Sequence, residues 1–121
     1  MNKEQALHSF WSGFGVPAYD ENTVPEDAAL PRITYEVSVD SFGGQVSLSA
    51  SIWDRSTSWI SVTEVADAVT QALSFGGRSI PYEGGLLWLK KGTPFAQRMG
   101  DTDDSIRRIY LNVEAEFLSE V

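Results

Sequence analysis

Residues able to do covalent or metal chemistry are scarce in this 121-residue chain. It contains no cysteine, which excludes thiolate nucleophiles, disulfides and cysteine-based zinc sites, and its single histidine, His8, cannot hold a metal ion alone. A serine nucleophile needs a positioned base, and His8 falls on a face of the predicted first helix. No nucleophile elbow, phosphate-binding loop or dinucleotide fingerprint occurs in the sequence. We therefore predict no enzymatic activity, no catalytic residue, no cofactor and no metal site.

The acidic segment 101–104 (DTDD) has the character of a calcium-binding loop. Ser105 and Ile106 stand where such a loop needs a further aspartate ligand and its turn glycine, and Asn112 stands where the bidentate glutamate belongs. This pattern excludes an EF-hand. Two interpretations stay open, a solvated acidic loop before the next strand and a divalent-cation contact at an interface.

The overall charge of the chain disfavours nucleic-acid binding. Seventeen acidic and nine basic side chains give a net charge of −8, the opposite of the basic surface that binds a phosphate backbone. We expect no sequence-specific nucleic-acid binding. No apolar run approaches the ~20 residues that span a bilayer, and no long apolar h-region follows the N-terminus, so we expect neither membrane insertion nor secretion.

Large side chains gather near predicted loops. Trp53 and Trp59 flank residues 54–58, while Phe95 and Met99 bracket residues 96–98. Tryptophan, tyrosine, methionine and arginine are the residues that interfaces favour. As a set they favour a binding protein over an enzyme, and the alternative for each single ring is burial under the sheet edge.

Two helices and five strands must position these residues. Helical spacing of apolar residues predicts a helix over 2–14. A second helix is predicted from the capping-box sequence at 61–64 to about Leu73, with Ile60 and Val65 as a hydrophobic staple. Strands are predicted at 32–39, 46–52, 79–82, 86–91 and 106–118, with long loops at 16–31 and 92–105.

Residues 46–52 place serines at 47, 49 and 51 on the side opposite the apolar row. This serine row indicates either a solvated sheet face or a surface against which another subunit lies. The element order predicts one α+β domain over residues 1–121, with a largely antiparallel sheet of four to five strands and two helices packed on one face. An all-β barrel is the alternative.

Six short strings carry a family resemblance, namely FW (10–11), GVPAY (15–19), LPRITY (30–35), WDRSTSW (53–59), GTPFAQRM (92–99) and DSIRR (104–108). In this order and spacing the chain resembles, over nearly its whole length, the tail terminator (tail completion, or minor capsid) proteins of long, non-contractile-tailed phages and prophages. The resemblance implies a small α+β subunit that forms a hexameric ring on the tail tube, stops tube polymerisation and presents a surface to the head-completion protein. The implied location is the head-proximal end of the virion tail, after synthesis in the host cytoplasm.

A closed ring needs contacts between two different patches of one subunit. We hypothesise that residues 53–59 and 92–104 form subunit or tail-tube contacts in which arginines face acids of a neighbour. The predicted interface residues are Trp53, Arg55, Trp59, Phe95, Arg98, Met99 and Arg107. A conduit lined by carboxylates would repel passing DNA, and the predicted lumen-facing acids are Asp101, Asp103, Asp104, Glu114 and Glu116.

Two alternatives remain at this point. The first is a head–tail connector or stopper subunit, which would contact the portal side and not the tail tube. The second is an unrelated α+β protein that binds a small molecule, which a deep pocket with convergent polar groups and a shifted pKa would favour.

Overall fold

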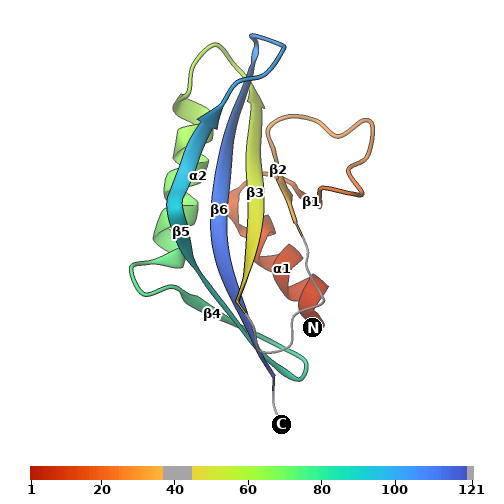
Figure 1. Ribbon diagram of the computed structural model, residues 1–121. Coiled ribbons are helices and arrows are strands. Elements are labelled where there is room, and N and C mark those ends of the chain that lie inside the picture. The colour runs from red at the N-terminus through yellow and green to blue at the C-terminus, as the bar shows by residue number, and fades with distance from the viewer. Residues whose placement is uncertain (37–44, 120–121) are drawn as a thin grey trace.

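The computed structural model describes residues 1–36 and 45–119 and shows two helices against one face of a curled, six-stranded sheet (Figure 1). The strand order is β1-β2-β3-β6-β5-β4. The predicted α+β class is confirmed, and the all-β alternative is wrong. The elements are α1 (Lys3–Trp11), a short 3-10 helix η1 (Ser12–Phe14), β1 (Ala18–Asp20), β2 (Arg32–Tyr35), β3 (Gln45–Arg55), α2 (Ile60–Leu73), β4 (Arg78–Tyr82), β5 (Gly85–Met99) and β6 (Ile106–Ser119).

Helix α1 begins with a reciprocal cap. The Asn2 side chain accepts a hydrogen bond from the Gln5 backbone N–H at 2.8 Å, and the Gln5 side chain accepts one from the Asn2 N–H at 3.0 Å. The regular helix ends at Trp11, and η1 continues to Phe14, where Gly15 adopts a positive φ of 82°. The two capping bonds between Asn2 and Gln5 satisfy backbone amides that the first turn of α1 would otherwise leave unpaired.

Helix α2 begins earlier than the predicted capping box. Its N-cap is Trp59, and the Ser61 hydroxyl donates to an Asp54 carboxylate oxygen at 2.6 Å instead of capping the helix. The hydroxyl is directed toward a charged acceptor at the end of β3, to which it donates a strong hydrogen bond. The staple is also wrong, because Ile60 is 68% exposed. The predicted end near Leu73 is confirmed.

The sheet has six strands where four to five were predicted. The additional strand is β1, which pairs in parallel with β2 and interrupts the predicted loop 16–31. Three residues are too short to show a period of two, which explains the error. The four remaining strand pairs are antiparallel, as predicted, and β6 is central between β3 and β5. Of the predicted strand over 32–39, the structure shows β2 at Arg32–Tyr35 and describes Glu36 outside the strand, while residues 37–39 lie outside the described residues.

The predicted loop 92–105 is mostly strand. β5 continues through Pro94 to Met99, and a bulge between Lys91 and Ala96 accommodates the proline. Beyond the end of β4 this part of β5 pairs only with β6, so the missing N–H of Pro94 breaks no ladder on its outer side. The connection to β6 shortens to residues 100–105.

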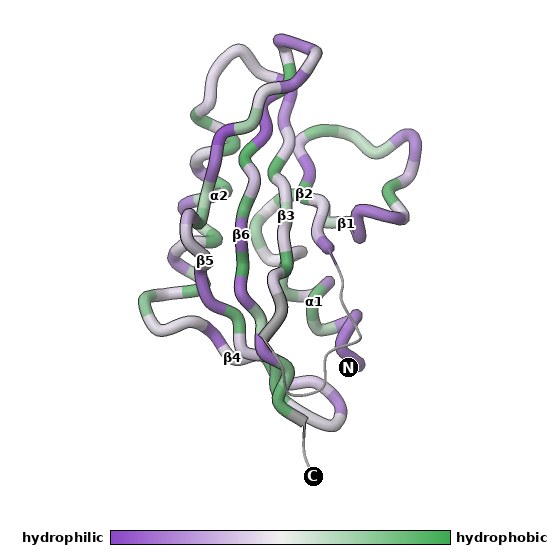
Figure 2. The backbone as a smooth tube through the Cα atoms, in the orientation of Figure 1, coloured by the Kyte–Doolittle hydropathy of each residue, from purple (hydrophilic) through white to green (hydrophobic). Residues whose placement is uncertain are grey.

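One continuous core lies between the helices and the sheet. It includes the α1 residues Leu7 and Trp11, the α2 residues Val62 and Val69, and the inward row of β6. Figure 2 shows the alternation of hydrophobic and hydrophilic residues along β6 that produces this row. The opposite sheet face has no helix over it in the described part of the chain (Figure 1) and is called the open face below.

The serine row on the open face is only partly solvated. Ser47 is exposed, whereas Ser49 and Ser51 are buried. The Ser49 hydroxyl donates to a Glu36 carboxylate oxygen, and the Ser51 hydroxyl accepts from the Arg108 Nε at 3.0 Å. Side chains of neighbouring strands therefore cover two of the three serines.

The Leu111→Ala substitution is expected to lower the free energy of unfolding by about 2–5 kcal/mol, because Leu111 is fully buried at the centre of β6 and truncation leaves a cavity. Leu118→Ala, on the same strand but 42% exposed, is the matched control and should cost less than about 1 kcal/mol. Urea denaturation of both variants measures the difference. Equal losses would contradict the assigned sides of β6.

Candidate interaction surface

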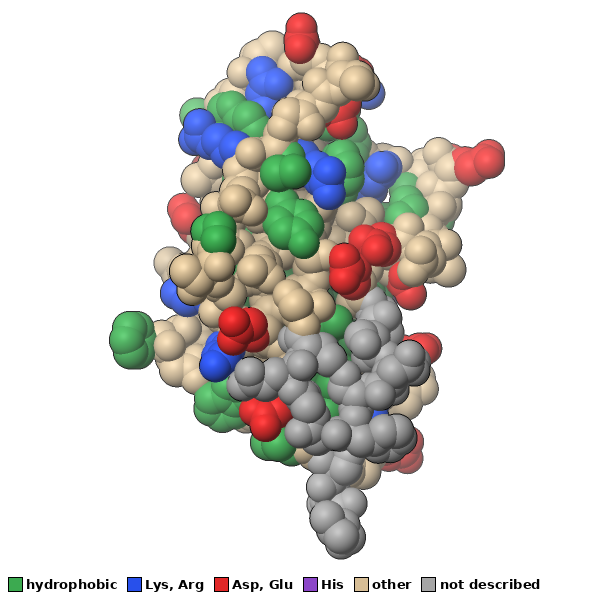
Figure 3. Space-filling model, viewed as in Figure 1, with side chains coloured by type: hydrophobic (Ala, Val, Ile, Leu, Met, Phe, Trp, Pro, Cys, Tyr) green, Lys and Arg blue, Asp and Glu red, His purple; other side chains and the backbone are tan. Residues whose placement is uncertain are grey.

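Arginines and tryptophans gather where β3 and β5 end and β6 begins, at the top of Figure 1. The register of the three strands brings them together, because Asp54 lies opposite Arg107 and Arg98 lies opposite Ile109. We call this cluster the arginine–tryptophan end, and it comprises Arg32, Trp53, Arg55, Trp59, Arg98, Arg107 and Arg108. Figure 3, viewed from the open face, shows Lys and Arg side chains gathered toward this end of the molecule.

Trp59 forms the part of the cluster on the helix side of the sheet. The guanidinium carbon of Arg98 lies 4.8 Å from a Trp59 ring centroid, and that of Arg107 lies 5.4 Å away. Both distances are within the range of cation–π attraction. Phe95, in the bulged part of β5, is half-buried and packs against the core.

Trp53 forms the corresponding part on the open face. Arg108 lies 4.5 Å from a Trp53 ring centroid, and Arg32 is the cross-strand neighbour on β2. The Trp53 indole N–H donates to the Thr34 hydroxyl at 2.9 Å. The ring is therefore fixed by a hydrogen bond and by a guanidinium that stacks close to it.

Most of these arginines bind neutral groups. Arg55 forms an ion pair with Asp103 at 3.3 Å. Arg32 donates to the Ala28 carbonyl at 2.9 Å, Arg107 donates to the Asp104 carbonyl at 2.7 Å and to the Thr57 carbonyl at 3.2 Å, and Arg108 donates to Ser51. Within residues 1–36 and 45–119, Arg32, Arg98, Arg107 and Arg108 form no ion pair.

This lack of ion pairs stands out in a chain with 17 acids and nine bases. Glu21 is close enough for Arg108 to lower its pKa, yet burial, Glu36 and Asp20 outweigh that effect and raise the pKa of Glu21 overall. Guanidinium groups that carry no carboxylate are available to an anionic partner. The arrangement suits recognition of an acidic protein surface.

All seven predicted interface residues lie at or beside this end, on two different faces. Trp53, Arg55 and Met99 belong to the open face. The other four, Trp59, Phe95, Arg98 and Arg107, lie on the helix side. Sequence reasoning missed Arg32 and Arg108. Strand alternation placed both on the outward side of their strands, but only the pairing of β2, β3 and β6 puts them beside Trp53.

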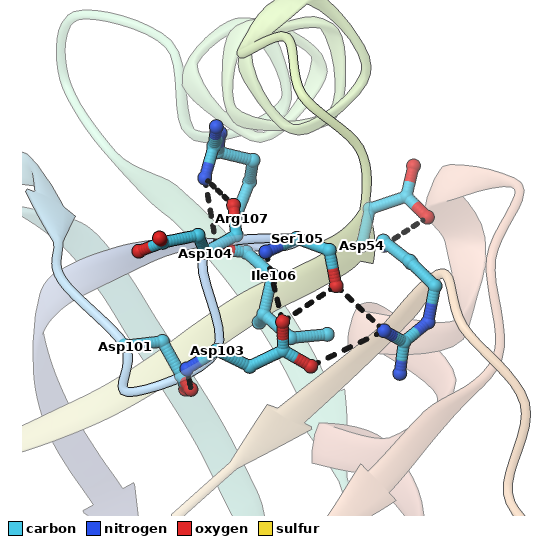
Figure 4. Close-up of polar contacts among 8 residues, drawn as sticks. Asp54, Asp101, Asp103, Asp104, Ser105, Ile106 and Arg107 are labelled. Carbon is cyan, nitrogen blue, oxygen red and sulfur yellow. Dashed lines mark hydrogen bonds and ion pairs between the residues drawn. The ribbon is translucent and has the colours of Figure 1, made fainter.

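The acids of the 101–104 segment hold the β5–β6 turn (Figure 4). Asp103 accepts hydrogen bonds from the Ser105 N–H at 2.9 Å and the Ser105 hydroxyl at 2.6 Å, and it also accepts from Arg55. Asp101 accepts from the Asp103 N–H at 2.9 Å. Among the described residues, no group of three or more His, Cys, Asp or Glu side chains could hold a metal ion.

The predicted lumen-facing acids do not form one cluster. Glu114 and Glu116 lie on the open face of β6, and Glu114 forms an ion pair with Lys90 at 3.4 Å. Residues 106–114 of β6 separate them from the 101–104 turn by about 26 Å at ~3.3 Å per residue. The two groups of acids therefore occupy opposite ends of the sheet.

A groove of about 840 Å³ beside α1 contains His8. The His8 Nδ1 lies 3.0 Å from the Tyr35 hydroxyl, and its Nε2 lies 3.3 Å from the Ser12 hydroxyl. Burial, followed by the charges of Asp20 and Glu4, raises the pKa of Tyr35, so its phenol stays protonated at neutral pH. Both ring nitrogens thus contact hydroxyls, and within residues 1–36 and 45–119 no hydrogen bond joins His8 to a carboxylate that would orient it as a base.

Comparison with known proteins identifies no relative of this chain. No protein-family model matches the chain, and no curated protein matches it. Of the helices in the described residues, none has the length and apolar character needed to cross a membrane.

The Ser105→Ala substitution is expected to raise the pKa of Asp103 part of the way toward its ordinary value of 3.8, since it removes the Ser105 hydroxyl bond, the largest cause of the lowered pKa, and keeps the bond from the Ser105 backbone N–H. When the pKa of an acid is lower in the folded state than in the unfolded state, the folded state is stabilised at any pH above the unfolded-state pKa. This stabilisation is lost as the pH falls through the folded-state pKa. NMR titration of the Asp103 carboxyl carbon measures the shift. An unchanged midpoint in Ser105→Ala would contradict the role of the hydroxyl bond.

Proposed function

We propose that this protein is a non-enzymatic virion subunit of the kind it resembles, a tail terminator that forms a hexameric ring on the tail tube, stops tube polymerisation and joins the tail to the head. The observation that supports this proposal is the arginine–tryptophan end. Four arginines that form no ion pair with any described residue surround two tryptophans at one end of an acidic chain. Tryptophan and arginine are the residues that most often dominate binding energy at interfaces.

A ring subunit must offer two different patches that meet in neighbouring copies. In the proposed ring, the arginine–tryptophan end of one subunit contacts an acidic surface of the next. Acids for such a surface are available elsewhere in the sequence. Only four of the 17 acids, Asp54, Asp101, Asp103 and Asp104, belong to segments 53–59 and 92–108, which contribute to the arginine–tryptophan end, and the other 13 lie outside these segments. Electrostatic complementarity between the two patches would fix the partner and the register.

The open face is proposed to line the DNA conduit. Glu114 and Glu116 lie on this face. Glu36, which follows the last residue of β2, also lies there and accepts a hydrogen bond from Ser49. A row of carboxylates and small hydroxyl groups repels a phosphate backbone, so DNA would pass without binding. In this arrangement the acids of the 101–104 turn belong to the contact between subunits and not to the conduit.

The test of the proposal is the solution mass by light scattering across protein concentration, with and without a divalent cation. We expect a species of about 80 kDa, six times the subunit mass of 13.3 kDa. If the protein is a monomer alone, it should still shorten the tubes formed by a tail tube protein in a co-assembly assay. A monomer that neither binds nor shortens tubes would contradict the proposal, and binding to a portal complex instead would support the stopper alternative.

The Arg98→Ala substitution is expected to weaken assembly by about tenfold per contact while changing the free energy of unfolding by less than about 0.5 kcal/mol. The Arg98 side chain is exposed and its described contact is the Trp59 ring, so its loss removes charge without opening the core. Assembly of the unmodified protein should also weaken with added salt. Analytical ultracentrifugation measures both effects.

Lys91→Ala is the matched control. Lys91 is a cation on the same strand, and it lies away from the arginine–tryptophan end, opposite Val113. Its replacement should leave assembly unchanged. Phe95 is unsuited to this test, because it packs against the core and its truncation would combine packing and assembly effects. Equal assembly of Arg98→Ala and Lys91→Ala would remove Arg98 from the interface.

A further inference from the structure

The connection between β1 and β2 carries two adjacent carboxylates in a tight turn. The Ala28 N–H donates to the Pro25 carbonyl at 3.1 Å, which closes a four-residue turn with Glu26 and Asp27 at its two central positions. Both residues are exposed, and neither forms an ion pair with any described residue. Segment 18–31 contains no basic residue, so no cation within the connection neutralises the two carboxylates.

Hydrogen bonds hold this connection against the edge of the sheet. Arg32 on β2 donates to the Ala28 carbonyl at 2.9 Å, and the Glu21 N–H donates to the Tyr35 carbonyl at 2.9 Å. The connection projects beyond β1, on the side of the sheet opposite to β5 and β4 (Figure 1), and Figure 3 shows acidic side chains on it. A segment that is ordered before it binds loses less conformational entropy on binding.

The helix side of the arginine–tryptophan end offers two adjacent cations. Arg98 and Arg107 both lie over the Trp59 indole, and within residues 1–36 and 45–119 neither forms an ion pair. Asp54, the cross-strand neighbour of Arg107, accepts a hydrogen bond from the Ser61 hydroxyl. Each of the two guanidinium groups is therefore available to a carboxylate, which it binds through charge-assisted hydrogen bonds.

The two charged patches lie too far apart to meet within one chain. β1 and β5 are separated by four steps in the strand order, which is about 19 Å at ~4.8 Å per strand. The acidic turn lies beyond the β1 edge of the sheet, whereas Arg98 lies on β5, close to the other edge. A neighbouring copy that approaches the β5 edge brings its own acidic turn toward the two arginines.

We propose that Glu26 and Asp27 of one copy bind Arg98 and Arg107 of a second copy of the chain. Two adjacent carboxylates then face two adjacent guanidinium groups, so the patches match in both the sign and the number of their charges, which fixes the partner and the register. The two patches are different surfaces of one subunit, and a contact between them repeats from copy to copy. The proposal rests on the proposed function in using the arginine–tryptophan end as a subunit interface, and it names the acidic surface which that end contacts.

The first test is carbodiimide cross-linking of the Arg98→Lys variant. This substitution keeps the cation and supplies an amine, which the reagent joins directly to a carboxylate in contact with it. Unlabelled and isotope-labelled samples of the variant are mixed, cross-linked and digested for mass spectrometry. We expect peptide pairs with mixed labels, which arise only between copies, to join position 98 to Glu26 or Asp27.

Two lysines of the same strand serve as internal controls. Lys90 forms an ion pair with Glu114 at 3.4 Å, so a cross-link between them within one copy shows that the reaction works. Lys91 lies on β5 away from the arginine–tryptophan end, and it should give at least tenfold less mixed-label product with the acidic turn than position 98 gives.

The second test exchanges the charges of the two patches. Arg98→Glu and the double variant Glu26→Lys/Asp27→Lys should each weaken self-association at least tenfold, because each places like charges together. An equal mixture of these two proteins should recover association, since the altered patch of one then meets the altered turn of the other. The double variant Glu4→Lys/Glu83→Lys is the matched control, because it changes the net charge equally at two exposed acids beside α1 and β4, and it should associate like the unmodified protein.

Sedimentation velocity measures association, and circular dichroism checks that each variant is folded. The proposal is overturned if position 98 joins only other acids, or if no mixed-label product forms while the Lys90–Glu114 product does. It is also overturned if the charge-exchanged mixture stays dissociated while the unmodified protein associates. If the unmodified protein does not associate measurably, the cross-link alone decides.

The outcome can be separated from that of the hexameric ring. A mass of about 80 kDa, six subunits of 13.3 kDa, together with cross-links from position 98 to other acids, would support the ring and overturn this contact. A mixed-label cross-link to Glu26 or Asp27 in a protein whose mass never exceeds that of a dimer would support the contact and contradict the ring.

Discussion

The antiparallel pairing of β6 with β3 and β5 is the constraint on which both the core and the arginine–tryptophan end depend. Its register sets Trp53 beside Arg108 on the open face and Asp54 beside Arg107 on the helix side. A slip of one residue would exchange the two faces of a strand. It would place Glu114 and Glu116 against the helices and the apolar row in water, so the hydrophobic effect that buries Leu111 also positions the arginines.

The elements predicted correctly are those with a strong local period. The apolar stripes of α1 and α2 and the long alternation of β6 are visible in the sequence because burial on one face repeats at fixed intervals. The errors fall where a distant residue decides. Ser61 turns to Asp54 on another element, β1 forms only because β2 lies beside it, and β5 passes Pro94 because β6 supports its other edge.

The candidate site was half predictable for the same reason. Residue type alone selected Trp53, Trp59 and Arg98 as interface residues, and they lie at one end of the sheet. Arg55 was expected to face a neighbour's acid, but in the monomer it contacts Asp103, which is 48 residues away in the sequence. Which acids and bases meet depends on strand pairing, and a single sequence does not contain that pairing in readable form.

The two tryptophans of the arginine–tryptophan end lie on opposite faces of one sheet. A flat surface that covers Trp53 cannot reach Trp59 at the same time, because the backbone layer of the sheet separates them. The arginine–tryptophan end therefore has two separate contact faces. Two molecules can bind at the same time, one on each face. A single rigid partner could contact both faces only if a cleft in that partner enclosed the end of the sheet.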